Sequence, residues 1–218
     1  AHSQAIKCLH LVVSTSDHAM LNQYDVWKRP MLRALLENGF TTEHLKFIPT
    51  LKTFVELLSS SDIEIEGLGI VFERLYLFII HSPAATTQQK QLSLELLLTL
   101  SERKEVLLRL FQSYDCNCFA PDALRQFVLT LTDVVNGKMK STDQFVSEQF
   151  DIDNEMRAWK ALMNIVDSIS ALLEDAPTTP SPVRDLIERK QLLSHGVELF
   201  RGDPALGVQY FVDNGFCQ

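Results

Sequence analysis

Apolar residues recur at spacings of three and four along almost the whole chain, and the two-residue alternation of strands is nearly absent. The clearest stretch begins at Leu124 and carries apolar residues at i, i+3, i+4, i+7 and i+10, until Asn136 and Gly137 provide a helix stop. Such a stripe lies along one face of an amphipathic helix and has to be buried against another element. The pattern therefore predicts an all-α chain.

Other segments share this helical character, and their succession predicts the architecture. They span residues 21–39, 43–61, 68–82, 88–100, 102–114, 156–173, 184–200 and 204–215. Pro30 and Pro49 are expected to kink or divide the first two, and the third is apolar on nearly every side, which indicates a buried central helix. Roughly eight or nine helices with short loops favour an armadillo- or HEAT-like stack of helical pairs. No fixed-period repeat is visible, so this expectation depends on the helix succession alone.

One segment near the C-terminal end cannot continue a helix. Residues 176–183 hold three prolines, which lack the N–H that helices and sheets need. We therefore expect a linker at 176–183, between a helical domain at residues 1–175 and a second unit at residues 184–218. Residues 137–150 are polar and unpatterned, and we expect a loop there.

Composition excludes several classes of function. Apolar residues make up 46% of the 218 residues and charged residues 22%, which is typical of an ordered globular protein. The net charge is −8 and Lys and Arg are not clustered, so the sequence predicts no nucleic-acid partner. No apolar run approaches the roughly 20 residues of a membrane-spanning helix. The four cysteines have no regular spacing, which favours a reducing compartment over a disulfide framework.

Two cysteines one residue apart raise the question of a metal or thiol site. Zinc ligands usually come in pairs spaced by about two to four residues, with a second pair elsewhere. Here Cys116 and Cys118 are too close for that pattern, the other two are Cys8 and Cys217 at opposite ends, and no histidine pair follows. No cationic side chain stands nearby in the sequence to lower a thiol pKa. We therefore predict no catalytic, metal or cofactor-binding residue in this chain.

The residues around these cysteines fit a joint between two helices. One helix is expected to end near Tyr114 and the next to begin near Pro121, which leaves unpaired backbone groups between them. Asp115 offers a short carboxylate that can accept from backbone N–H groups, as an N-cap side chain does. Tyr114 can bury its ring while its hydroxyl keeps a polar partner. The sequence thus predicts a structural role for this stretch.

Residues 107–131, LLRLFQSYDCNCFAPDALRQFVLTL, resemble the signature box of a known domain. This is the HUS domain (homology upstream of Sec-seven) of the large Golgi-acting Arf guanine-nucleotide exchange factors, in which Asn-Tyr-Asp-Cys-Asp follows an apolar helix. Tyr114, Asp115 and Cys116 match that core, whereas Ser113 and Asn117 depart from it. The resemblance makes residues 114–117 the structural or interaction box.

The C-terminal stretch KQLLSHGVELFRGDPALGVQYFVDNGF is similar to the first two helices of the exchange-catalysing Sec-seven domain. The matching residues are Gly196, Phe200, Pro204, Gly207, Tyr210, Phe211 and Gly215. We take Gly196, Phe200, Pro204 and Gly207 as the signature of a catalytic-domain start, truncated here. Arg201 and Asp203 replace residues usual in the family, which puts charge-dependent contacts there in doubt.

The resemblance implies a non-catalytic regulatory segment of a large Arf exchange factor. The catalytic glutamate of that family lies in a Phe-Arg-Leu-Pro-Gly-Glu-like motif that this sequence lacks, so we expect no exchange activity from it. The implied partners are the N-terminal dimerisation and cyclophilin-binding domain of the same protein and Arf-family small GTPases, and homodimerisation of the parent is left open. The implied location is cytoplasmic, at Golgi or trans-Golgi membranes, with peripheral attachment through partners.

Two alternatives from other classes stay open at this point. A helical-repeat adaptor with no connection to Arf would have the same helix succession. A thiol- or metal-dependent enzyme would have to use the cysteines of the joint.

Overall fold

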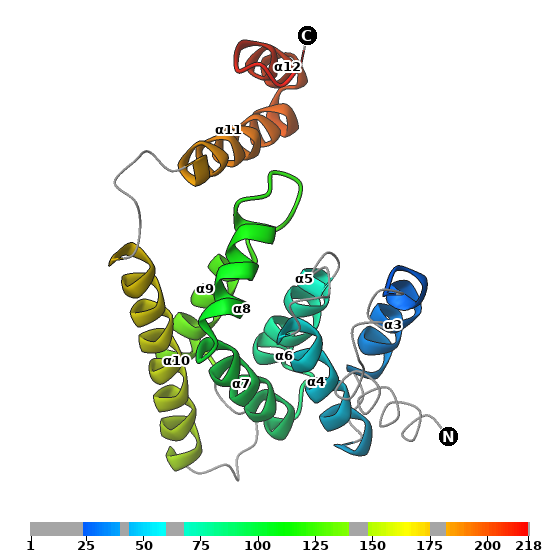
Figure 1. Cartoon of the computed structure of the whole chain (residues 1–218), viewed down its shortest axis with the longest axis vertical. Helices are drawn as coiled ribbons and strands as arrows, with labels where there is room; N and C mark the ends of the chain where they lie inside the picture. Colours follow the sequence, from blue (N-terminus) through cyan, green and yellow to red (C-terminus); the bar gives the residue numbers. More distant parts are fainter. Residues whose placement is uncertain (1–23, 40–43, 60–67, 140–147, 175–181, 218) are drawn as a thin grey trace.

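The computed structural model describes residues 24–39, 44–59, 68–139, 148–174 and 182–217, and these ranges contain helices and turns but no strand (Figure 1). The elements in chain order are α3 (Tyr24–Gly39), α4 (His44–Ser59), α5 (Leu68–Val71), η1 (Phe72–Leu77), α6 (Phe78–His81), α7 (Thr87–Ser101), α8 (Lys104–Leu110), η2 (Phe111–Asp115), α9 (Ala123–Val135), α10 (Glu148–Glu174), α11 (Pro182–Gly202) and α12 (Pro204–Asp213). The two η elements are π-helical turns. The prediction of an all-α fold is confirmed.

Neighbouring helices pack side by side in a stack. α3 contacts α4, α4 contacts α7, α7 contacts α10, and α10 also contacts α9 (Figure 1). α4 and α7 thus each lie between two neighbouring helices, as expected of stacked helical pairs. None of the described helices has a stretch long and apolar enough to cross a lipid bilayer.

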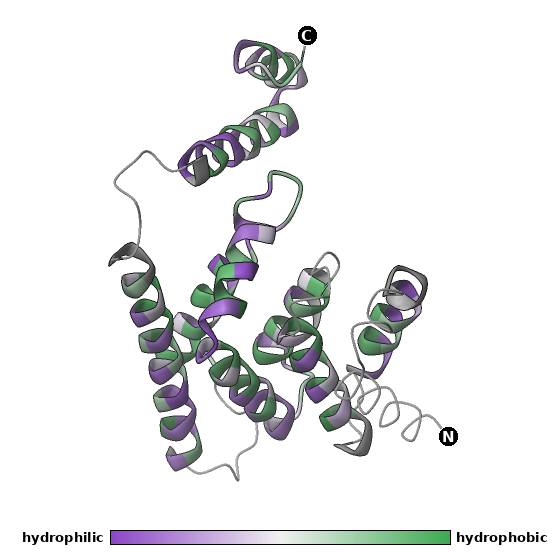
Figure 2. Ribbon diagram, in the orientation of Figure 1, coloured by the Kyte–Doolittle hydropathy of each residue, from purple (hydrophilic) through white to green (hydrophobic). Residues whose placement is uncertain are grey.

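The core is centred on one continuous helical segment formed by α5, η1 and α6. Within it, Phe72 and Tyr76 are fully buried and stack against Phe54 of α4, with ring centroids 6.2 and 4.4 Å apart, respectively. Phe72 also meets Phe127 of α9 edge to face at 5.5 Å. Burying each of these side chains contributes about 2 to 3 kcal/mol. Figure 2 shows hydrophobic residues concentrated on these central helices. The prediction of a central buried helix is confirmed.

The structure differs from the sequence prediction at several helix and loop boundaries. Pro30 lies inside α3 and Pro49 inside α4, so neither proline divides its helix. α10 already begins at Glu148, inside the predicted loop at 137–150. The predicted linker at 176–183 begins after α10 ends, but α11 already starts at Pro182, because a proline is accepted at the first helical position. Residues 175–181 lie outside the described part of the chain. The division into two domains stays a prediction.

Candidate functional site: the joint between α8 and α9

The joint begins where α8 continues into the π-helical turn η2. The N–H of Cys116 donates to the carbonyl oxygen of Phe111 at 2.9 Å, which is the wider i to i+5 bond of a π-helix. This turn places Tyr114, which is only 3% exposed, against the start of the central helix. The path of the backbone therefore aims Tyr114 into the core.

Tyr114 connects the joint to α5 through Gly69. The N–H of Gly69 donates to the Tyr114 hydroxyl oxygen at 2.7 Å, which satisfies a donor in the first turn of that helix. The ring lies so close that a Cβ on Gly69 would be 2.2 Å from Tyr114 Cε1. A glycine at position 69 is thus required for this contact. Sequence reasoning did not predict this role, because nothing in the local pattern shows which ring lies against position 69.

Asp115 caps α9 across the joint. Its two carboxylate oxygens accept from the N–H groups of Leu124 and Arg125, at 2.8 and 3.0 Å. Asp122, which directly precedes α9, makes no capping bond with its own side chain. Burial raises the pKa of the Asp115 carboxyl above its usual range, an effect that the two N–H bonds and Lys190 oppose. An N-cap of this kind contributes about 1 kcal/mol to stability.

The two cysteines of the joint have different surroundings. Cys116 is buried, and burial followed by the nearby Asp115 charge raises the pKa of its thiol, which disfavours the nucleophilic thiolate. Cys118 is a free, partly exposed cysteine in the following turn. There the side-chain oxygen of Asn117 accepts from the N–H of Phe119 at 2.9 Å, which shapes the turn. Among the described residues, no group of three His, Cys, Asp or Glu side chains could hold a metal ion.

A lysine from beyond the linker completes the joint. Lys190 of α11 donates from Nζ to the carbonyl oxygen of Tyr114 at 2.7 Å and forms an ion pair with Asp122 at 2.5 Å. The Lys190 side chain is only 11% exposed. A cation at the end of a helix also interacts favourably with the helix dipole. Sequence reasoning missed Lys190, because nothing in the local pattern distinguishes it from other lysines on a polar face.

An open pocket of about 460 Å³ lies between the joint and α11. Asp115, Asp122 and Arg125 line it from the joint, and His195 and Glu198 line it from α11. The carboxylates of Asp115 and Asp122 are already occupied by backbone N–H groups and by Lys190. The pocket is therefore the seam between two packed segments.

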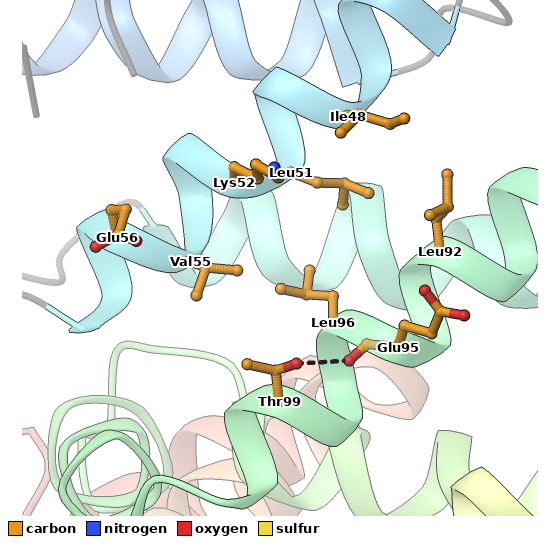
Figure 3. A pocket seen from close by; sticks show the side chains of 9 residues that line it. All are labelled: Ile48, Leu51, Lys52, Val55, Glu56, Leu92, Glu95, Leu96 and Thr99. Carbon is orange, nitrogen blue, oxygen red and sulfur yellow. Dashed lines mark hydrogen bonds between the residues drawn. The ribbon is translucent and has the colours of Figure 1, made fainter. Parts of the chain in front are cut away.

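A second concave surface lies between α4 and α7, with a volume of about 470 Å³ (Figure 3). Leu51, Val55 and Leu96 give it an apolar floor, and Lys52 and Glu95 add charge to its lining. A reaction centre needs convergent polar groups on the floor of such a site. The apolar floor of this surface lacks such groups.

The residues of the predicted catalytic-domain signature come together in α11 and α12. Asp203 caps α12 by accepting from Ala205 N–H at 2.9 Å, and Pro204 takes the first helical position. Gly207 lies against the backbone of Phe200, where an added Cβ would be 2.3 Å from the Phe200 Cα. Gly196 lies equally close to the ring of Phe211. Both glycines thus allow the two helices to approach closely.

Taken together, these features define an all-α scaffold of stacked helices whose polar joint has a structural role. Residues 5–122 match the family of the Mon2/Sec7/BIG1-like HUS domain, which is more than half of the chain and includes the box at 114–117. The chain belongs to this family. The HUS domain is a non-catalytic region of Sec7-type Arf guanine-nucleotide exchange factors, so the resemblance to the HUS domain is confirmed. The resemblance of the C-terminal stretch to the catalytic-domain start stays a prediction. No solved structure matches the chain.

Proposed function

We propose that this chain is a regulatory and protein-interaction segment of a large Arf guanine-nucleotide exchange factor. The proposed roles of the chain are intramolecular packing, recruitment to Golgi membranes through partners, and control of Arf activation in vesicle traffic. The observation that carries the proposal is the contact of Lys190 with the HUS box. Lys190 is 76 residues away from Tyr114 in sequence and stands on a helix that resembles the start of the catalytic domain.

The chemistry of this contact supports coupling between the two segments. The ammonium group is largely removed from water, and its partners are a helix-end carbonyl and one carboxylate. Removing one member of such a buried charged pair typically costs about 2 to 5 kcal/mol, because the other charge stays desolvated. A shift of the joint would therefore change the position or the stability of α11. In the intact exchange factor this would connect a regulatory domain to the catalytic one.

A nucleotide-exchange assay on the parent exchange factor tests the coupling. Lys190→Gln removes the charge, and we expect a changed rate of nucleotide release from an Arf-family GTPase. Lys138→Gln is the matched control, because Lys138 makes an ion pair with Asp133 on the surface and is 63% exposed. Equal rates for the wild type and Lys190→Gln would contradict the coupling.

A binding experiment tests the proposed partners directly. The purified chain is immobilised and incubated with the N-terminal dimerisation and cyclophilin-binding domain, and separately with an Arf-family GTPase loaded with GTP or GDP. We expect retention of the N-terminal domain and of the GTP-loaded form in preference to the GDP-loaded form. If neither is retained, the chain acts as an adaptor of another kind. The proposed cytoplasmic and Golgi location is tested by imaging the tagged parent protein.

A further inference from the structure

α10 carries a second apolar face that the fold leaves exposed. Six large apolar side chains, each between 44% and 65% exposed, follow one another along this helix. We call them the α10 stripe: Ile152, Met156, Trp159, Met163, Val166 and Ile169. Monomeric proteins rarely expose contiguous apolar patches larger than a few hundred Å².

The stripe does not belong to the core of the fold. The core side of α10 is formed by small or branched residues, among them the buried Ala158, Ala161 and Ile165, which face the rest of the stack. That side contacts α7 and α9, and Figure 1 shows α10 along the outer edge of the stack. The helix is therefore apolar on two sides and has a packed partner on one of them.

The spacing of the stripe is that of a helix pair. From Ile152 to Val166 the exposed residues are separated by four, three, four and three positions, which is the alternation of a and d positions in a coiled coil. Met156 and Met163 occupy the a positions, where a flexible side chain adapts to the opposite helix. Trp159, at a d position, is the kind of large aromatic residue that anchors interfaces.

We propose that the α10 stripe pairs with the α10 stripe of a second copy of this chain, in parallel and in register. The surface is large enough for this partner. Six side chains that each expose about half of roughly 200 Å² present about 600 Å² per copy. Two copies then bury up to about 1,200 Å², which exceeds the roughly 1,000 Å² expected of a specific interface.

The charges beside the middle of the stripe, at Glu155 and Lys160, favour the parallel arrangement. In a parallel pair, each g position faces the e position five residues further along the partner helix. Glu155 occupies a g position and Lys160 an e position, so each Glu155 meets Lys160 of the second copy, and this happens twice. An antiparallel pair centred on the stripe would instead bring the two Lys160 side chains together. Lys160 also pairs with Glu102 of its own chain at 3.2 Å, and an ammonium group has donors for both carboxylates.

The test is the mass of the purified chain in solution as a function of concentration, by light scattering and sedimentation. We expect the mass to rise from 24.8 kDa towards twice that value. Met163→Glu should weaken the dimer by more than about tenfold, because it places two carboxylates in the apolar seam. Phe119→Glu is the matched control, because it makes the same change of charge at a side chain that is 94% exposed on the loop of the joint. Circular dichroism shows whether each variant is folded.

The register is tested by exchanging the charges. Glu155→Lys should weaken the dimer because two like charges then face each other, and adding Lys160→Glu should restore it. A wild-type chain that is monomeric at about 200 µM would overturn the proposal and leave the stripe for a different helical partner. A dimer that survives Met163→Glu, or that Phe119→Glu disrupts equally, would also overturn it. Failure of the double variant to restore the dimer would overturn the parallel arrangement.

Discussion

The central part of the stack and the α11–α12 pair use similar amphipathic helices, yet they differ in how much they bury. In the central part, Phe72, Tyr76 and Phe127 have no exposed surface. In residues 184–217, the buried positions are Lys190, Gly196 and Gly207, two of which are glycines. The pair instead exposes large apolar side chains such as Leu206 at 60% and Val208 at 51%. The first region is a closed core, whereas the second is a helix pair with an apolar surface still to be covered.

In both regions, however, a glycine allows a close contact that a larger residue would block. Gly69 makes room for the ring of Tyr114, and Gly207 makes room for the backbone of Phe200. In the joint, this contact is supported on all sides by the core. In the α11–α12 pair, other contacts between the two helices include the edge-to-face rings of His195 and Tyr210. We therefore expect the glycine contact in the joint to affect the global stability of the fold, and the glycine contact in the α11–α12 pair to affect local stability only.

The largest effect should come from removing a core ring. Phe127→Ala leaves a cavity beside Phe72, and we expect the free energy of unfolding to fall by about 3 to 5 kcal/mol. Val208→Ala on the exposed α12 surface should change it by less than about 0.5 kcal/mol. Denaturant unfolding of both variants measures this contrast. Equal losses would mean that α12 is part of the same closed core.

Adding a methyl group at each of the two glycines distinguishes global from local destabilisation. Gly69→Ala places a Cβ against the Tyr114 ring, and we expect about 1 to 3 kcal/mol of global destabilisation from overpacking. Gly207→Ala should separate α12 from α11 and leave the main unfolding transition nearly unchanged. Hydrogen exchange would then show loss of protection in α12 alone. Global unfolding caused by Gly207→Ala would contradict the distinction between the two regions.

The cap across the joint should give a smaller effect. Asp115→Ala removes the acceptor for two N–H groups at the start of α9, and we expect a loss of about 1 kcal/mol or more. Asp115→Asn keeps one amide oxygen as an acceptor and should lose less. Thermal melting of the two variants provides the measurement. Unchanged melting and unchanged partner binding of Asp115→Ala would show that the cap is dispensable.

The pH dependence of this carboxyl should be the smallest effect. Its pKa is raised on folding, so its stabilising contribution is present below the unfolded-state pKa of about 3.9 and is lost as the pH rises through the folded-state value. The stability of the wild type relative to Asp115→Asn should therefore decrease with rising pH across this window. Chemical denaturation at several pH values measures the difference. An increase with pH would mean that the N–H bonds and Lys190 outweigh burial.

The sequence predicted the parts of the joint that depend on neighbours along the chain. A carboxylate between two helical patterns is in reach of the next helix start, so a capping role for Asp115 could be inferred from its position. The π-helical turn at Phe111–Asp115 could not, because one extra residue per turn leaves almost no trace in the periodicity of a short segment. The same holds for Pro49, since the surrounding packing holds α4 together despite the missing N–H.

By itself, the sequence determined the helical class, the apolar faces and the family, because periodicity and motif spacing are local properties. Only the tertiary structure decided which faces meet. The contact of Lys190 with Tyr114 depends on how the chain returns after 76 residues, and the room for Tyr114 depends on a missing side chain at Gly69. The tertiary structure likewise left the α10 stripe exposed. Burial of a given face follows from the sum of many weak contacts across the whole molecule, and no local pattern contains that sum.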